Sequence, residues 1–206
     1  MDIEYKGGNC VVISTKKATI VVDPRLSDIG LKDVAPKDSI VVATQTSFSI
    51  ETDEVAVDQP GEYEIKGVSI VGVPAQRLID ADGKGATMYR IATSDFTVAV
   101  VGHVSTPLNE AQLEALGIVD IVIVPVGGSG YTLDAHQAVA VVRQIDPKLV
   151  IPTHYADKSI KYEVPQMELE PFIKELAVPV EQTAKLKLKN GIMPDALTVY
   201  EIQRTA

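Results

Sequence analysis

The sequence predicts a mixed α/β fold in which two β-sheets pack face to face and helices lie outside them. Three observations lead to this prediction: short strand patterns fill the first half of the chain, strands alternate with helices in the second half, and strand patterns return near the end. Each sheet must bury an apolar face against another layer, and this order of elements is typical of stacked sheets. The 206 residues suit one sizeable domain, and no linker interrupts them, so we expect a single domain over residues 1–206.

The first half of the chain consists almost entirely of expected strands. Apolar and β-branched residues recur in short runs, with turn residues such as glycine, asparagine and proline between them. The third strand ends at Asp23, whose carboxylate either caps the following turn or lines a site. The expected strands cover residues 3–5, 10–13, 19–22, 39–43, 54–57, 63–65 and 68–73.

Helices enter in the second half. After a polar loop over residues 76–86, an expected hairpin of residues 88–92 and 96–101 leads to the first helix. Asn109 is a suitable N-cap for this helix, because its side chain can accept a hydrogen bond from the first turn. Gly117 is suited to end it.

One stretch of the second half carries the clearest pattern, a strand, a glycine-rich loop, a helix and another strand. Residues 121–124 and 149–151 are short apolar runs, typical of strands buried on both faces. Thr132 is the expected N-cap of the helix between them. Ligands gather beyond the strand ends of an open α/β sheet, so we expect the loop at residues 127–130 and His154 to face one site.

The end of the chain returns to strands. A helix is expected over residues 166–176, with Pro171 as a break or a fresh start. Lys185, Lys187 and Lys189 alternate with leucines, which predicts a half-exposed edge strand protected by charge. The remaining expected strands and turn cover residues 178–180, 184–188, 190–191 and 197–202.

Charge and cysteine content argue against several classes of partner. The net charge of −9 argues against nucleic acid or an anionic membrane as a partner, because either would require a basic face on the protein. Cys10 is the only cysteine, so no intramolecular disulfide can form, and its apolar strand predicts a buried, inert thiol. The first residues lack a signal-peptide pattern, and no apolar run is long enough to span a bilayer. We therefore expect a cytoplasmic protein without nucleic-acid or membrane partners.

Four segments, in chain order, resemble the metallo-β-lactamase fold. They are residues 3–12 with their Gly-Gly-Asn turn, residues 20–24 ending in Asp-Pro, residues 59–64 with the sequence Gln-Pro-Gly-Glu-Tyr-Glu, and residues 119–155. Within that superfamily they are similar to a branch of small cytoplasmic zinc-dependent hydrolases that includes ascorbate-6-phosphate lactonase. The resemblance implies a four-layer αββα sandwich, and it implies that the chain forms a homo-oligomer.

The metal-ligand motif of this family is degenerate in the sequence. The resemblance implies an H-x-H-x-D-H cluster directly after the strand at residues 39–43, where Thr44 matches the family's leading residue. Amide, hydroxyl and alkyl side chains stand at its four ligand positions, and all are poor zinc ligands. In chain order these positions hold Gln45, Ser47, Ser49 and Ile50.

Two histidines remain at other positions of the family pattern. His103 follows Gly102 where relatives carry a bridging Asp, and His154 matches the last ligand of the motif Pro-Thr-His-Tyr. Residues 73–77, where relatives often carry a further histidine, contain none. His136 lies on a predicted helix and is expected to face solvent, and Asp134 is expected in the first turn of that helix, where the helix dipole favours a carboxylate.

The first hypothesis is a metal-free, catalytically degenerate homologue that acts as a binding or assembly protein, with no cofactor and with a small molecule as its ligand. Its vestigial pocket would combine polar side chains from several strand ends. These are Asp23, Gln45, Ser47, Ser49, His103 and His154.

The alternative hypothesis is a divergent hydrolase with a site rebuilt on His103 and His154. Zinc could be held by the two imidazoles with a carboxylate from Asp23 or Asp134. Without metal, one of the imidazoles could serve as base for a serine nucleophile at position 47 or 49. Substitution of both histidines tests this alternative.

Overall fold

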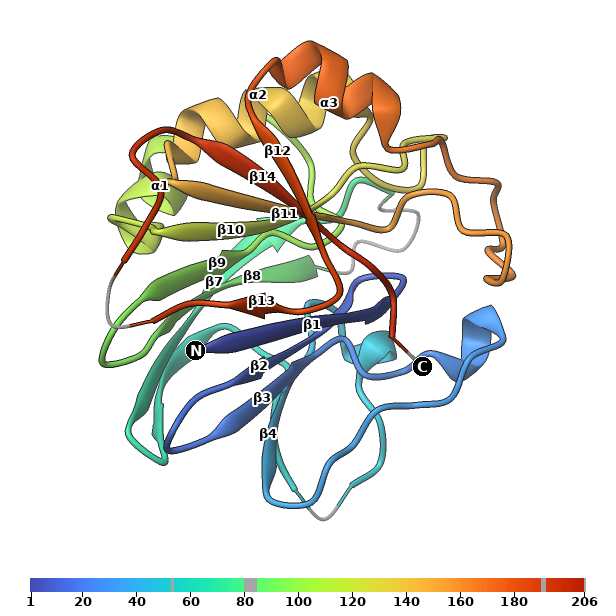
Figure 1. Ribbon diagram of the computed structural model, residues 1–206. Coiled ribbons are helices and arrows are strands. Elements are labelled where there is room, and N and C mark those ends of the chain that lie inside the picture. Colours follow the sequence, from blue (N-terminus) through green and yellow to red (C-terminus); the bar gives the residue numbers. More distant parts are fainter. Residues whose placement is uncertain (53, 80–84, 190–191, 206) are drawn as a thin grey trace.

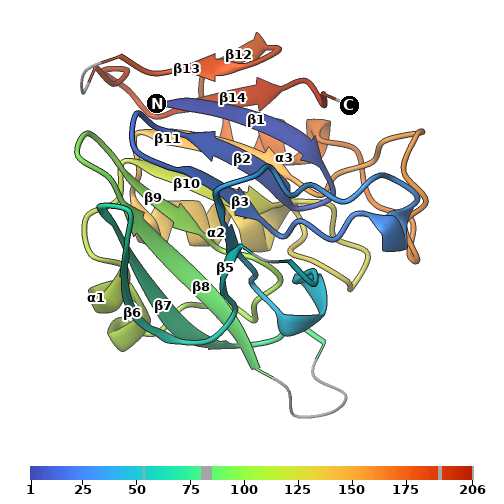
Figure 2. The same ribbon diagram turned by 90° about the horizontal axis from the view of Figure 1, so that it is seen from below.

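The computed structural model describes residues 1–52, 54–79, 85–189 and 192–205. It contains two sheets that pack face to face (Figures 1 and 2). Parts of the polar loop expected over residues 76–86, and the turn expected at 190–191, lie outside the described residues. The six-stranded sheet has the order β13 (Leu186–Lys187), β1 (Asp2–Gly7), β2 (Cys10–Ser14), β3 (Thr19–Val22), β4 (Ser39–Val42) and β5 (Val55–Val57).

The eight-stranded sheet contains the central strand pair predicted from the sequence. β10 and β11 run in parallel, with Ile121 opposite Leu149 and Pro125 opposite Thr153. Every residue of both strands is buried, which confirms that they are covered on both faces. The sheet has the order β12 (Val180–Thr183), β14 (Thr198–Ile202), β11 (Leu149–Thr153), β10 (Ile121–Pro125), β9 (Thr97–Val100), β8 (Gly85–Ala92), β7 (Val68–Gln76) and β6 (Gly61–Ile65).

Two apolar clusters hold the layers together. Between the sheets, side chains such as Ile20 and Val42 meet Ile91 and Ile123 in one buried cluster. A second cluster lies between the eight-stranded sheet and the helices, all of which cover its outer face (Figure 1). Because both faces of this sheet are apolar, alternate residues of one strand serve the two clusters. The helices are α1 (Glu110–Leu116), α2 (Ala135–Ile145) and α3 (Glu170–Leu176).

The outer face of the six-stranded sheet is covered by a loop. Leu26, at the start of the 3₁₀ turn η1 (Ser27–Ile29), packs on Cys10, Val12 and Val21. Cys10 is therefore buried, as the sequence predicts. The predicted fold class is confirmed, and its fourth layer is this loop rather than an α-helix.

Helix starts differ from the prediction in two places. Thr132 is not the N-cap of α2; Asp134 is, and it forms a capping box with Gln137. The last helix begins at Glu170, four residues after its expected start, with Pro171 in its first turn as a fresh start. The reason is tertiary: the Met167 N–H donates to the Gly127 carbonyl at 2.7 Å, so this segment bonds to the glycine loop instead of to itself.

The lysine-rich segment near the end of the chain has the predicted edge position. β13 lies at the edge of the six-stranded sheet, and the Lys185 ammonium contacts Asp2 and Glu4 of β1 at 3.2 and 2.8 Å. Within the described ranges, no helix combines the length and apolar character that a membrane crossing requires.

Candidate functional site

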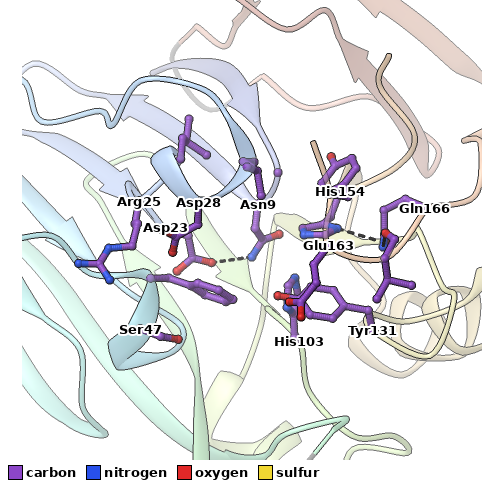
Figure 3. A pocket seen from close by; sticks show the side chains of 16 residues that line it. Asn9, Asp23, Arg25, Asp28, Ser47, His103, Tyr131, His154, Glu163 and Gln166 are labelled. Atoms are coloured by element: carbon purple, nitrogen blue, oxygen red, sulfur yellow. Dashed lines mark hydrogen bonds between the residues drawn. The ribbon is translucent and has the colours of Figure 1, made fainter. Parts of the chain in front are cut away.

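A pocket of about 260 Å³ opens where several strands of both sheets end. Its walls come from the turn after β1, the loop after β3, the 3₁₀ turn η2 (Thr46–Phe48) and the segment after β11 (Figure 3). His103, three residues after β9, and Tyr131, directly after the glycine loop, complete them. Strand ends bring side chains from distant parts of the sequence together, as the pattern predicted. The labelled lining residues in Figure 3 are Asn9, Asp23, Arg25, Asp28, Ser47, His103, Tyr131, His154, Glu163 and Gln166.

Asp23 ties three segments together on one side of the pocket. One carboxylate oxygen accepts a hydrogen bond from the Thr44 backbone N–H at 2.7 Å. The other accepts from the Asn9 amide at 2.7 Å and from the Thr44 hydroxyl at 2.8 Å. Burial raises the pKa of Asp23 to about 6, against the lowering effect of these hydrogen bonds. Asp23 thus lines the pocket, and the hydrogen bonds of its carboxylate go to Asn9 and Thr44 rather than to the turn that follows it.

His154 is fixed through its backbone. It has a positive φ of 54°, and its N–H donates to the Gly8 carbonyl at 2.8 Å. Gly127 makes this arrangement possible, because a Cβ at that position would lie 2.0 Å from the His154 carbonyl oxygen. The His154 ring nitrogen Nδ1 lies 3.3 Å from Gln166 Oε1. The expected proximity of the glycine loop and His154 is thus present at Gly127.

The two histidine rings meet in the pocket. Their centroids are 4.6 Å apart with planes at 87°, an edge-to-face contact. Phe48 and Tyr131 contact His103, and Tyr162 packs on His154 (Figure 3 shows both histidines and Tyr131). These rings give the pocket an aromatic wall on its histidine side.

Both imidazoles are neutral at physiological pH. Burial lowers the pKa of His154 to about 4. Burial also lowers the pKa of His103 well below its usual range, and the neighbouring His154 and Arg77 lower it further. The Nε2 atom of His103 is buried and has no hydrogen-bond partner in the described part of the chain. His103 therefore retains an unused polar atom at the pocket.

The structure separates the four residues at the ligand positions that the resemblance implies. Ser47 lines the histidine pocket, whereas Gln45 lines two adjoining clefts of about 350 and 810 Å³. Ser49 ends the 3₁₀ turn η2, and neither it nor Ile50 lines these three cavities. Of the predicted vestigial set, the pocket thus brings together Asp23, Ser47, His103 and His154.

Gln45 has a partner that the sequence did not reveal. The Arg77 guanidinium donates a hydrogen bond to the buried Gln45 amide oxygen. Arg77 follows β7, where an isolated bridge to Val104 holds its backbone beside the segment of His103. The only sequence signal was indirect: relatives often carry a histidine in residues 73–77, and this chain carries an arginine there.

The residues present do not fit the metal centre that the fold family implies. Over the described ranges, no three His, Cys, Asp or Glu side chains are grouped so that they could hold a metal ion. Asp134 does not complete the histidine pair, because it caps α2 and is exposed. His136 faces solvent, as predicted, and contacts Glu175 at 2.7 Å. Asp23 is already occupied by three hydrogen bonds.

Comparison with known proteins agrees with the fold. Residues 2–154 match the model of the beta-lactamase superfamily domain. A metal-dependent hydrolase of Natranaerobius thermophilus is 26% identical over 188 residues, covering 75% of this chain and 83% of that protein.

Solved structures show the same architecture. A protein of Thermotoga maritima, described as a zinc-dependent hydrolase of the metallo-beta-lactamase superfamily, has a TM-score of 0.74 at 24% identity and covers 98% of this chain and 100% of its own. A metallo hydrolase of Ignicoccus hospitalis has a TM-score of 0.62 at 17% identity, covering 85% of this chain and 90% of its own. At these identities the structures show a shared fold.

Proposed function

The chain belongs to the beta-lactamase superfamily, and from this premise we propose that it is a metal-independent member that binds a small molecule in the histidine pocket. The Natranaerobius relative is described as a metal-dependent hydrolase, and the Thermotoga structure as a zinc-dependent hydrolase of the metallo-beta-lactamase superfamily. In this chain the proposed role is to bind a small molecule or to take part in an assembly. The protein would not hydrolyse a substrate with a zinc-bound hydroxide.

The observation that carries the proposal is that Gln45, the residue at the first ligand position, is paired with Arg77. Gln45 accepts a hydrogen bond from Arg77, so a permanent cation lies where the fold would otherwise require ligands for a metal cation. Like charges repel, and the guanidinium therefore opposes metal binding in addition to the missing ligands. The neutral histidines supply two imidazoles, fewer than the three protein ligands that zinc sites of enzymes use.

The pocket itself is suited to a ligand. It is concave and partly lined by aromatic rings, and it offers polar atoms of Asn9, Ser47 and the two histidines. Small-molecule sites combine such apolar walls with a few polar groups. A cytoplasmic location, which the single cysteine favours, and assembly into a homo-oligomer, which rests on the resemblance alone, belong to the same proposal.

Metal analysis tests the proposal directly. We expect protein purified without chelator, and then incubated with zinc, manganese or iron and desalted, to retain far less than one equivalent of any metal. The matched control restores the motif through Gln45→His, Ser47→His, Ser49→Asp and Ile50→His, together with Arg77→Ala, and this variant should retain zinc. One or two equivalents in the unaltered protein would refute the proposal.

A second candidate is favoured by the close histidine pair with its unpartnered Nε2 atom. It is a divergent hydrolase whose rebuilt site uses His103 and His154, with or without metal. The lowered pKa values make both imidazoles weak bases, which argues against the metal-free form. If metal is retained, His103→Asn and His154→Asn distinguish this candidate, because each substitution should then abolish retention.

A further inference from the structure

Arg77 carries a charge that the described structure does not neutralise. Its side chain is half-buried and bonded to the neutral amide of Gln45. No carboxylate of the described residues forms an ion pair with it. A guanidinium stays protonated under all physiological conditions and presents five N–H donors. One amide oxygen cannot satisfy this fork, so further donors remain for a ligand.

The cleft beside Arg77 has room for such a ligand. Its volume is about 350 Å³, and its lining includes Gln45, His103 and Tyr131. His103 is 4% exposed, and its Nε2 atom lacks a partner among the described residues. Two residues with independent features therefore line one cleft: Arg77, whose charge is incompletely paired, and His103, whose buried Nε2 atom has no hydrogen bond among the described residues.

The chemistry of these groups favours an oxyanion, either a planar carboxylate or a tetrahedral phosphate group. Arginine forks match carboxylate and phosphate geometry, and hydrogen bonds to an ionised partner are the stronger kind. The neutral His103 can donate from Nε2 in one of its tautomers. The Glu163 carboxylate, which also lines the cleft, would repel a bound anion. Because Glu163 is exposed, solvent weakens this repulsion.

We propose that Arg77 is the anchor of an oxyanion subsite, and that the ligand of this protein carries a carboxylate or a phosphate group bound in the cleft between Gln45 and His103. The inference rests on the proposed metal-independent binding function and names the chemical class of its ligand. In this site a guanidinium fixed by Gln45 provides the positive charge for an anionic ligand.

Inorganic phosphate and acetate are the probes that test the subsite. Thermal unfolding is recorded at constant ionic strength, with chloride replaced stepwise by either anion. We expect phosphate, acetate or both to raise the Tm by a few degrees, since a ligand that binds only the folded state stabilises it. Two-dimensional NMR should show the Arg77 Nε–H and Gln45 side-chain signals shifting with the same saturation curve.

Variants assign the effect to one arginine. Arg77→Gln should weaken anion binding at least about tenfold, because it removes a charge-assisted hydrogen bond. Arg143→Gln on the exposed face of α2 is the matched control and should respond like the unaltered protein. Arg25→Gln tests the other arginine, which lines the histidine pocket. NMR on the unaltered protein gives an answer even if Arg77→Gln folds poorly.

The pH dependence separates Arg77 from the histidines. Binding through the guanidinium should be unchanged up to at least about pH 8, because this group keeps its proton. Binding through a protonated imidazole would disappear well below that pH, because the imidazole loses its proton there. A response to neither anion, or a response lost in Arg25→Gln but not in Arg77→Gln, would overturn the inference. A metal-free protein with no anion response contradicts only this inference, whereas retained metal contradicts the proposed function.

Discussion

At the scale of single residues, the site is governed by buried groups whose charged forms are disfavoured. His154 and His103 have lowered pKa values, and Asp23 has a raised one, and in all three cases the largest cause is burial. These residues lie at strand ends that also connect the two sheets. Their ionisation therefore affects folding as well as ligand binding.

The histidine pair predicts acid sensitivity. The folded pKa of His154 is about 4, below the value of 6.5 for the free side chain. A lowered histidine pKa gives stability that is present above about pH 6.5 and is lost as the pH falls towards 4. The fall in pKa corresponds to about 3 kcal/mol at most. Asp23 works in the opposite direction over part of this range, because its raised pKa favours the folded state at lower pH.

We expect His154→Asn to lose less stability than the unaltered protein between about pH 6.5 and pH 4. Asparagine suits the test because it tolerates the positive φ at this position better than alanine. Urea unfolding across the pH series measures the difference, and Asp23 contributes equally to both proteins. The exposed His136→Asn should reproduce the unaltered profile; an unchanged profile for His154→Asn would show that His154 does not cause the acid loss.

At the scale of elements, side-chain geometry decides between neighbouring candidates for one structural role. Thr132 and Asp134 both have residue types suited to an N-cap, but only Asp134 reaches the Gln137 N–H, at 2.8 Å. The Thr132 hydroxyl is buried without a partner in the described part of the chain. The sequence pattern located the helix correctly and named the wrong cap. The signal that it overlooked is Gln137, three residues after Asp134, which is the spacing of a capping box and which Thr132 lacks.

The two positions therefore predict opposite outcomes. Asp134→Ala should reduce the free energy of unfolding by about 1 kcal/mol, since the cap is lost, and Asp134→Asn should retain most of it. Thr132→Val should be neutral or slightly stabilising, because it removes a buried hydroxyl that has no hydrogen bond. Equilibrium urea unfolding measures all three; equal destabilisation by Thr132→Val and Asp134→Ala would contradict this assignment.

The predictable and unpredictable parts of the fold differ in the range of the interactions. Strands follow local alternation and turn residues, so their positions were predicted to within a few residues. The start of α3 was not, because Met167 donates to Gly127 from a distant part of the chain. At the site, strand ends identified Asp23 and both histidines, whereas the bond from Arg77 to Gln45 spans 32 residues and follows no local pattern.

At the scale of the whole molecule, apolar packing and hydrogen bonds at the strand ends hold the two sheets together at the pocket. One buried cluster draws residues from both sheets. Asn9, in the turn between β1 and β2, accepts a hydrogen bond from the Thr153 hydroxyl of β11 at 2.6 Å and donates one to Asp23. A fold that needed a metal at this junction would gain its binding free energy on folding and would lose stability with a chelator. Here the described residues join the strand ends by direct hydrogen bonds instead.

Chelation should consequently leave the stability of the whole molecule unchanged. We expect the Tm to agree within about 1 °C with and without EDTA, and after addition of zinc, because a ligand that does not bind the folded state cannot shift its unfolding. The variant with the restored ligand motif and Arg77→Ala provides the contrast, since its Tm should rise with zinc and fall with EDTA. Differential scanning calorimetry on both proteins measures this. A decrease of several degrees in the unaltered protein would mean that a metal contributes to holding the two sheets together, and the hydrogen bonds of Asn9 to Thr153 and Asp23 would then not be sufficient to explain how the strand ends are held.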